Sequence, residues 1–292
     1  MRVMDRAPEL RTPSPLVARL RWVMVGAIGV SALLTLICQP KSFWHDPATA
    51  IRGDSLPIHD PTNHTFEFFL GYGAVAYLAA NLIYIALAFF VVSRLPRIVA
   101  SLAVFFLLFA HGYGAANWLG THFGLGVGPS PALWGIACGI ALSFAILPTA
   151  DNPRGLVRYW RWIMVATLFV DFAFTLLGQP ASYWHDPSTM HEGNSITRLF
   201  RGRSWLHLLG MNLAFAAGEL ALVTFLPLPV AFVCAFAFTF GSFSGATNWL
   251  FYVWRLGWPA VIGYGLVLSA LMVLPCLRDK RPGGHLGEAS LP

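Results

Sequence analysis

The sequence predicts an all-α integral membrane protein of about eight transmembrane helices, arranged as two parallel four-helix repeats (4+4). Composition, the length of the apolar stretches and a set of repeated motifs lead to this prediction. Of the 292 residues, 57% are hydrophobic and only 11% are charged. Soluble domains carry about 25% charged residues, so this chain has too few charges to cover a surface that faces water.

The apolar residues gather into stretches of about 17 to 25 residues, long enough to cross a hydrocarbon core of about 30 Å as helices. Each stretch is apolar throughout rather than alternating, which favours helices over a barrel. We expect helices near residues 22–38, 66–92, 97–119, 131–148, 162–178, 204–226, 228–251 and 258–276.

Two motifs occur twice in the same order, which indicates an internal duplication. The pattern QPxxxWHDP covers residues 39–47 and returns at 179–187, and the pattern GAxNWL covers 114–119 and returns at 245–250. A repeat unit with an even number of helices places equivalent motifs on the same side of the membrane. We therefore divide the chain into an N-terminal segment (1–21), a first repeat (22–150), a second repeat (151–276) and a polar tail (277–292) that we expect to be disordered.

The basic residues predict the orientation. With the N-terminus inside, 13 of the 19 Lys and Arg residues fall on inner segments and six on outer ones, as the positive-inside rule requires. Both termini are then cytoplasmic, and we expect a multi-pass protein of a bacterial inner (plasma) membrane. The basic residues sort by loop instead of clustering on one face, which argues against a nucleic-acid partner.

The orientation places both QPxxxWHDP motifs at the outer interface, where two interpretations stay open. In the structural one, Asp46 and Asp186 cap short helices and the tryptophans anchor in the interface. In the functional one, the motifs form a pair of outer pockets that hold a polar ligand. The candidates for ligand binding, from these motifs and nearby polar positions, are Trp44, His45, Asp46, His111, Asn117, Trp184, His185, Asp186, Arg201, His207 and Asn248.

Asp171 and Glu219 lie inside apolar stretches, where a charge is costly unless it is paired or hydrated. Counted from the inner ends of their helices, they lie about 14 Å and about 10 Å deep. At a shared depth on consecutive helices, the two carboxylates could share a proton and couple protons or cations to transport. Alternatively, both are protonated and bond to neighbouring helices. We align them with Ser31 and Asn81 of the first repeat.

The sequence predicts no metal site and assigns no cofactor. Its histidines and acidic residues lack the tight spacing of zinc motifs. His111 and His207 differ in depth by roughly 7 Å, which argues against a haem held between them. The cysteines have the positions of small core residues rather than of a disulfide framework; they are Cys38, Cys138, Cys234 and Cys276.

These features predict a carrier or permease for a small polar or anionic solute, with outer ligand pockets and an intramembrane carboxylate pair. Two alternatives stay open. One is an intramembrane enzyme that acts on a lipid or isoprenoid, with Asp171, Glu219 or His207 as acid–base groups. The other is a non-catalytic subunit or scaffold of a larger membrane complex. The expected partners are the bilayer, a small-molecule or lipid substrate, and further membrane subunits.

Overall fold

The computed structural model describes residues 14–51, 68–125, 129–191 and 204–277, in which helices alternate with short turns and no strand occurs. Eight helices are long and apolar enough to cross a membrane. They are α1 (Pro15–Ile37), α3 (Ala74–Arg94), α4 (Arg97–His122), α5 (Pro129–Ile146), α6 (Pro153–Leu177), α8 (Trp205–Phe225), α9 (Leu228–Asn248) and α10 (Gly257–Val273). The expected eight-helix membrane protein is therefore confirmed at this level.

Short helices fill the connections. The 3₁₀ helices are η1 (Lys41–Trp44), η2 (Pro47–Thr49), η4 (Leu147–Thr149), η5 (Ala181–Trp184), η6 (Pro187–Thr189) and η8 (Leu274–Leu277), and η7 (Trp249–Val253) is a π-helix. The first long helix begins at residue 15, well before the apolar stretch does. Ser14 caps it by accepting a hydrogen bond from the Val17 N–H, and a proline follows at the first helical position.

The turns between α3 and α4 and between α8 and α9 share one cause. Leu95 and Leu226 each precede a proline and have extended backbone, with ψ of 151° and 156°. The proline ring disfavours the helical conformation in the residue before it. Each long apolar segment is thereby divided into two antiparallel helices.

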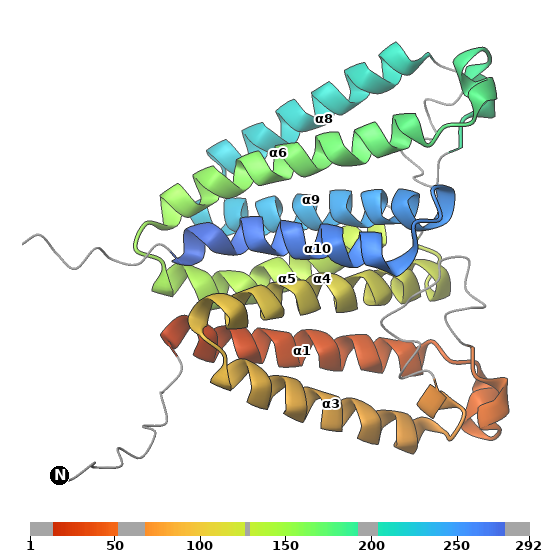
Figure 1. Cartoon of the computed structure of the whole chain (residues 1–292), viewed down its shortest axis with the longest axis vertical. Coiled ribbons are helices and arrows are strands. Elements are labelled where there is room, and N and C mark those ends of the chain that lie inside the picture. The colour runs from red at the N-terminus through yellow and green to blue at the C-terminus, as the bar shows by residue number, and fades with distance from the viewer. Residues whose placement is uncertain (1–13, 52–67, 126–128, 192–203, 278–292) are drawn as a thin grey trace, which may run out of the picture.

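The helices form a central group with a pair on either side (Figure 1). Helices α4, α5, α9 and α10 lie in the middle, α1 and α3 on one side, and α6 and α8 on the other. The fourth helix of each expected repeat packs on the third helix of the other, α5 on α9 and α10 on α4. The two expected repeats therefore interlock along the middle.

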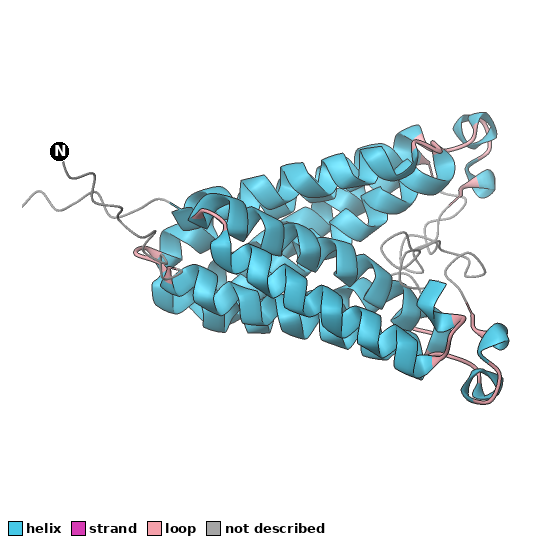
Figure 2. Ribbon diagram, turned by 60° about the horizontal axis from the view of Figure 1, so that its bottom comes forward, coloured by secondary structure: helices cyan, strands magenta, loops and turns pink. Residues whose placement is uncertain are grey.

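The two ends of this bundle differ in what they carry (Figures 1 and 2). The start of α1 and the end of α10 lie together at one end, which we call the terminal end. The short helices η1, η2, η5 and η6, which overlap both copies of QPxxxWHDP, lie at the opposite end, which we call the motif end. Both motifs therefore lie on the same side of the helices.

Close contact between α5 and α9 depends on two glycines one helical turn apart. A Cβ atom on Gly135 would lie 2.8 Å from Ala237 Cα, and one on Gly139 would lie 3.1 Å from Val233 O. A methyl group would overlap the α9 backbone at Gly135 and press tightly against it at Gly139. Small residues at such spacing let membrane helices approach closely and gain van der Waals contact.

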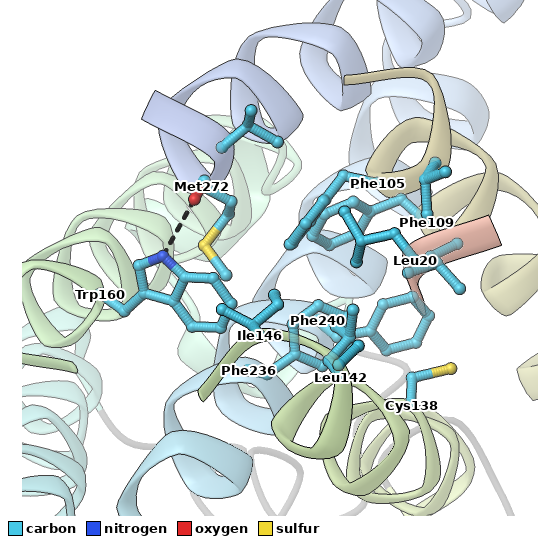
Figure 3. Close-up of a cluster of buried hydrophobic side chains, with 14 of the residues drawn as sticks. Leu20, Phe105, Phe109, Cys138, Leu142, Ile146, Trp160, Phe236, Phe240 and Met272 are labelled. Carbon is cyan, nitrogen blue, oxygen red and sulfur yellow. Dashed lines mark hydrogen bonds between the residues drawn. The ribbon is translucent and has the colours of Figure 1, made fainter. Parts of the chain in front are cut away.

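Aromatic side chains fill the middle of the bundle (Figure 3). Phe109 of α4 stacks on Phe240 of α9, with ring centroids 5.8 Å apart, and meets Phe243 at 4.8 Å. The buried Trp160 of α6 donates a 3.0 Å hydrogen bond from Nε1 to Met272 O of α10. This bond satisfies the indole N–H inside an apolar region, where an unpaired donor is costly.

Candidate functional site

The glutamine of each QPxxxWHDP motif ties the end of a long helix to a later part of the loop. Gln39 Nε2 donates to Thr35 O (3.0 Å) and Ile51 O (3.1 Å), and its Oε1 accepts from Ile51 N (2.8 Å). Gln179 makes the same three bonds to the residues 140 positions further along, at 2.8 to 2.9 Å. The two segments thus share one local structure.

The aspartates of the motifs are helix caps. Asp46 Oδ1 accepts from Ala48 N at 3.0 Å, and Asp186 Oδ1 accepts from Ser188 N at 2.9 Å. Hydrogen bonds from Ser188, through its side chain and its N–H, hold the pKa of the Asp186 carboxyl below its ordinary value of 3.8. The capping interpretation is confirmed for both aspartates.

The neighbouring candidates of the motifs face outward. His45 and His185 are exposed, and the side chains of Trp44 and Trp184 are 56% and 51% exposed. A ligand role for these four residues stays a prediction. Their exposure at the edge of the bundle agrees with the interfacial position expected of tryptophans.

The histidine candidates lie in different surroundings. His207 is exposed near the start of α8, where its Nδ1 lies 2.9 Å from Ser204 Oγ. His111 is buried in α4, with Nε2 3.3 Å from the hydroxyl of Tyr84 on α3. These two histidines have different hydrogen-bonding partners, on different helices. Arg201 lies outside the described residues.

Asn117 and Asn248, the asparagines of the two GAxNWL motifs, occupy different hydrogen-bonding environments. Tyr113 of α4 donates a 2.6 Å bond from its hydroxyl to Asn248 Oδ1 of α9. Asn117 is buried, and its Nδ2 has no hydrogen-bond partner within the described part of the chain. A donor of this kind, left unsatisfied among packed helices, can serve a ligand oxygen.

The carboxylate of Asp171 on α6 lies directly against α9. A Cβ atom on Gly245 would lie 2.6 Å from both carboxylate oxygens, so the glycine makes the room that the carboxylate occupies. Gly245 and Asn248 are one helical turn apart on α9, about 4.5 Å along the axis. The tyrosine–asparagine bond and the carboxylate therefore meet the same part of α9.

One aromatic residue of α10, Tyr264, lies near this carboxylate. Tyr264 is close enough to Asp171 to interact with it electrostatically, and its own hydroxyl is buried with no hydrogen-bond partner among the described residues. The ring of Tyr264 stacks on Phe243 at 5.3 Å and lies 6.4 Å from Phe174. We define the Asp171 site by the residues Tyr113, Asp171, Gly245, Asn248 and Tyr264.

Helix α9, which carries Gly245 and Asn248, changes from α-helical to π-helical hydrogen bonding directly after Asn248. Trp254 N donates to Trp249 O at 3.1 Å, an i→i+5 bond typical of a π-helix. The corresponding part of α4 stays α-helical to His122. The turn ends with a left-handed residue, Arg255, at φ 52°. This irregularity is not predicted from the sequence, because both copies of GAxNWL have the pattern of ordinary helix.

The expected pair of Asp171 and Glu219 stays a prediction, because the contacts that locate Asp171 are with α9 and α10. Glu219 is half-buried on α8, and its Oε2 has no hydrogen-bond partner among the described residues. The alignment of Glu219 with Asn81 is wrong. Asn81 Nδ2 donates to Tyr77 O just as Asn212 Nδ2 donates to Leu208 O, both at 2.9 Å. This register aligns Asn81 with Asn212, two turns before Glu219.

Within the described ranges, no three His, Cys, Asp or Glu side chains gather as ligands for a metal ion. No protein-family model matches this chain, and the comparisons find neither a similar curated protein nor a similar solved structure.

Proposed function

We propose that this protein is a carrier or permease for a small polar or anionic solute, in which Asp171 couples transport to a proton or cation. One observation carries the proposal. Asp171 lies inside a membrane helix against Gly245, one turn from the hydrogen-bonded Asn248 and just before a π-helical turn. Ionisable groups inside spans and interrupted helices are recurrent features of transport sites.

The cost of the carboxylate supports a functional role. A charged side chain at the centre of a span costs about 3 kcal/mol on insertion scales. Asp171 takes a position where the first half of the chain has Ser31, which donates a hydrogen bond from Oγ to His111 O. A serine can therefore occupy the corresponding position without placing a charge in the membrane. The carboxylate adds a group that can bind and release a proton.

Polar groups close to the carboxylate support a polar solute. Tyr113 of α4 and Asn248 of α9 are hydrogen-bonded to each other. Asn117 lies one turn after Tyr113 on α4, and its Nδ2 donor has no hydrogen-bond partner in the described part of the chain. A solute with an acceptor oxygen could bond to Asn117 and compete for the Tyr113–Asn248 bond. The π-helical turn that follows Asn248 is a feature found frequently at functional sites.

The finer architecture belongs to this proposal. We propose that the chain is an internal duplication of two parallel four-helix repeats in a bacterial inner membrane, with both termini cytoplasmic and the motif end outside. Support comes from hydrogen bonds that recur at the repeat spacing in both glutamine loops. The excess of basic residues on the expected inner segments supports the orientation. Glu219 is proposed as a second coupling group.

The test is solute-driven proton movement into proteoliposomes that contain the full-length chain and a pH-sensitive dye. A panel of sugars, amines, carboxylates and phosphate esters is added outside. We expect at least one class to change the internal pH, and we expect Asp171→Asn to abolish that change while the protein stays folded. Ser31→Ala, at the matched position of the first half, should keep it.

Two results would contradict the proposal. In the first, no solute of the panel moves protons or is itself taken up when its internal concentration is measured directly. In the second, Asp171→Asn transports as well as the wild type. Uptake that continues in the variant without proton movement would instead retain the carrier and identify Asp171 as its coupling group.

A further inference from the structure

A groove between α1 and α3 opens on the side of the bundle, at the terminal end. Its volume is about 560 Å³. The α3 wall is one face of the helix, with Leu82, Ala86, Phe89 and Phe90 at intervals of three and four residues. Trp22 contributes the facing wall from α1. In a membrane-spanning bundle, such an apolar and exposed face meets acyl chains rather than water.

Two arginines close the groove at the terminal end. The guanidinium of Arg21 lies 4.5 Å from the ring centre of Phe89, and that of Arg94 lies 4.7 Å from the ring centre of Phe90. Arg21 Nη1 donates a 3.1 Å bond to Ser93 Oγ. Among the described residues, no carboxylate pairs with Arg21 or Arg94. The groove therefore combines an apolar trough with two cations that lack a counter-charge from those residues.

The length of the trough matches one leaflet. From Leu82 to Arg94, α3 rises about 18 Å, and half of a hydrocarbon core of about 30 Å is about 15 Å. Arg94 is the last residue of α3, so the cations lie where headgroups begin. Long basic side chains at helix ends reach toward that interface.

The corresponding place between α6 and α8 lacks the same chemistry. Phe225 stands where the first half has Arg94, and Leu220 stands where it has Phe89. Arg161 is retained at the position of Arg21 and donates a 3.4 Å bond to Thr224 Oγ1. The Arg161 guanidinium lies 5.4 Å from the ring centre of Trp162, but no arginine stands at the position of Arg94. The two sides of the molecule therefore differ by the charge of Arg94 and by the rings of Phe89 and Phe90.

We propose that the groove between α1 and α3 binds one anionic phospholipid of the membrane. Its phosphate lies between Arg21 and Arg94, and one acyl chain lies along Phe89, Ala86 and Leu82. Guanidinium groups bind phosphate oxygens through paired, charge-assisted hydrogen bonds. The rings of Phe89 and Phe90 hold both guanidiniums in place, so less side-chain freedom is lost when the lipid binds. This inference is independent of the proposed transport.

Native mass spectrometry of the full-length protein in non-ionic detergent tests the proposal. The delipidated protein is titrated with dioleoyl-phosphatidylglycerol and, separately, with dioleoyl-phosphatidylcholine, which has the same acyl chains and no net charge. We expect the first phosphatidylglycerol to bind more tightly than the first phosphatidylcholine. Arg94→Gln should weaken the first phosphatidylglycerol about fivefold, as expected for one basic residue at a lipid surface, and should leave phosphatidylcholine unchanged.

Matched variants separate the groove from general lipid affinity. Ala86→Trp should fill the trough and weaken phosphatidylglycerol, whereas Ala217→Trp, at the corresponding place on α8, should not. Arg161→Gln should bind phosphatidylglycerol like the wild type. Arg94 is exposed, so its replacement tests the charge without disturbing the partly buried Arg21.

Three outcomes would overturn the proposal. Equal affinity for the two lipids would show that the charge is not recognised. An equal loss in Arg94→Gln and Arg161→Gln would remove the difference between the two sides. Displacement of phosphatidylglycerol by inorganic phosphate alone, with Ala86→Trp still binding normally, would assign the arginines to a free anion rather than to a lipid.

Discussion

The hydroxyl of Tyr113 on α4 donates a 2.6 Å hydrogen bond to Asn248 on α9, and this bond joins two central helices from different halves of the chain. Asn248 is the last α-helical residue of α9 before the π-helix begins. The bond therefore fixes the relative positions of α4 and α9 at the point where α9 changes its hydrogen bonding.

Removal of this bond should destabilise the bundle. Tyr113→Phe takes away the donor and leaves the partly buried Asn248 oxygen without it, at a cost of about 0.5 to 1.5 kcal/mol for a typical intramolecular hydrogen bond. Thermal unfolding in detergent measures the effect. Tyr72→Phe is the control, because the Tyr72 side chain is 66% exposed. Equal melting temperatures for the two variants would mean that the bond contributes nothing to stability.

Two glycines of α9 should respond to alanine with opposite signs. Gly245→Ala places a methyl group 2.6 Å from the Asp171 oxygens, and overpacking of this kind costs about 1 to 3 kcal/mol. Gly241→Ala meets nothing within 4 Å and should stabilise the helix by about 0.5 to 1 kcal/mol. Thermal unfolding of both variants checks the predicted changes in stability. Proton-coupled transport by Gly245→Ala shows whether the displaced carboxylate still functions. A neutral Gly245→Ala would mean that Asp171 can easily occupy another position.

The two motif glutamines should be equivalent in the folded protein. Gln39→Ala and Gln179→Ala each remove three hydrogen bonds that hold a loop to its helix. We expect the amides of Ile51 and His191 to exchange with deuterium about tenfold faster, which corresponds to about 1.4 kcal/mol of local stability. Lys41→Ala, at an exposed position, should leave both amides unchanged. A large effect in only one loop would contradict equivalent roles.

The cap at Asp186 should depend on pH below the ordinary carboxyl range. Hydrogen bonds from Ser188 lower the pKa of Asp186 from 3.8, so folding favours the ionised form. The cap's contribution is then complete above pH 3.8 and is lost as the pH falls through the lower, folded value.

A carbon-13 NMR titration of aspartate carboxyls checks this, with Asp186→Asn used to assign the signal. The Asp186 midpoint should lie below 3.8 in the wild type. It should rise in Ser188→Ala, which introduces the alanine that the first motif has as Ala48. A wild-type midpoint at or above the ordinary value would show that the hydrogen bonds do not form.

Hydropathy was enough to predict the eight helices, because a span must be both long and apolar. It missed the start of α1, since Arg19 and Arg21 interrupt the apolar pattern. Both arginines donate hydrogen bonds to other helices, Arg19 to Phe144 O and Arg21 to Ser93 Oγ. Such side chains are tolerated near a helix end because they keep hydrogen-bonding partners.

The candidate site could be predicted only in part, because contacts between helices depend on which faces meet. The charge of Asp171 marks it in the sequence, and Gly245 belongs to the second GAxNWL motif, but nothing in the sequence predicts that these two residues meet. The π-helix begins at Trp249, whose ring lies where a side chain on Gly178 would be. In the first half the corresponding residue is Cys38, whose Sγ lies 4.0 Å from Trp118 O.

The contact of α5 with α9 has a consequence for biosynthesis. Gly135 and Gly139 of α5 pack against α9, whose first residue, Leu228, is translated roughly 90 residues later. At about 5 to 20 residues per second, this is a delay of roughly 5 to 20 seconds. During that time the face of α5 that carries these glycines lacks the helix that packs on it. We expect a chaperone or the insertion machinery to remain bound to the nascent chain until α9 has emerged from the ribosome.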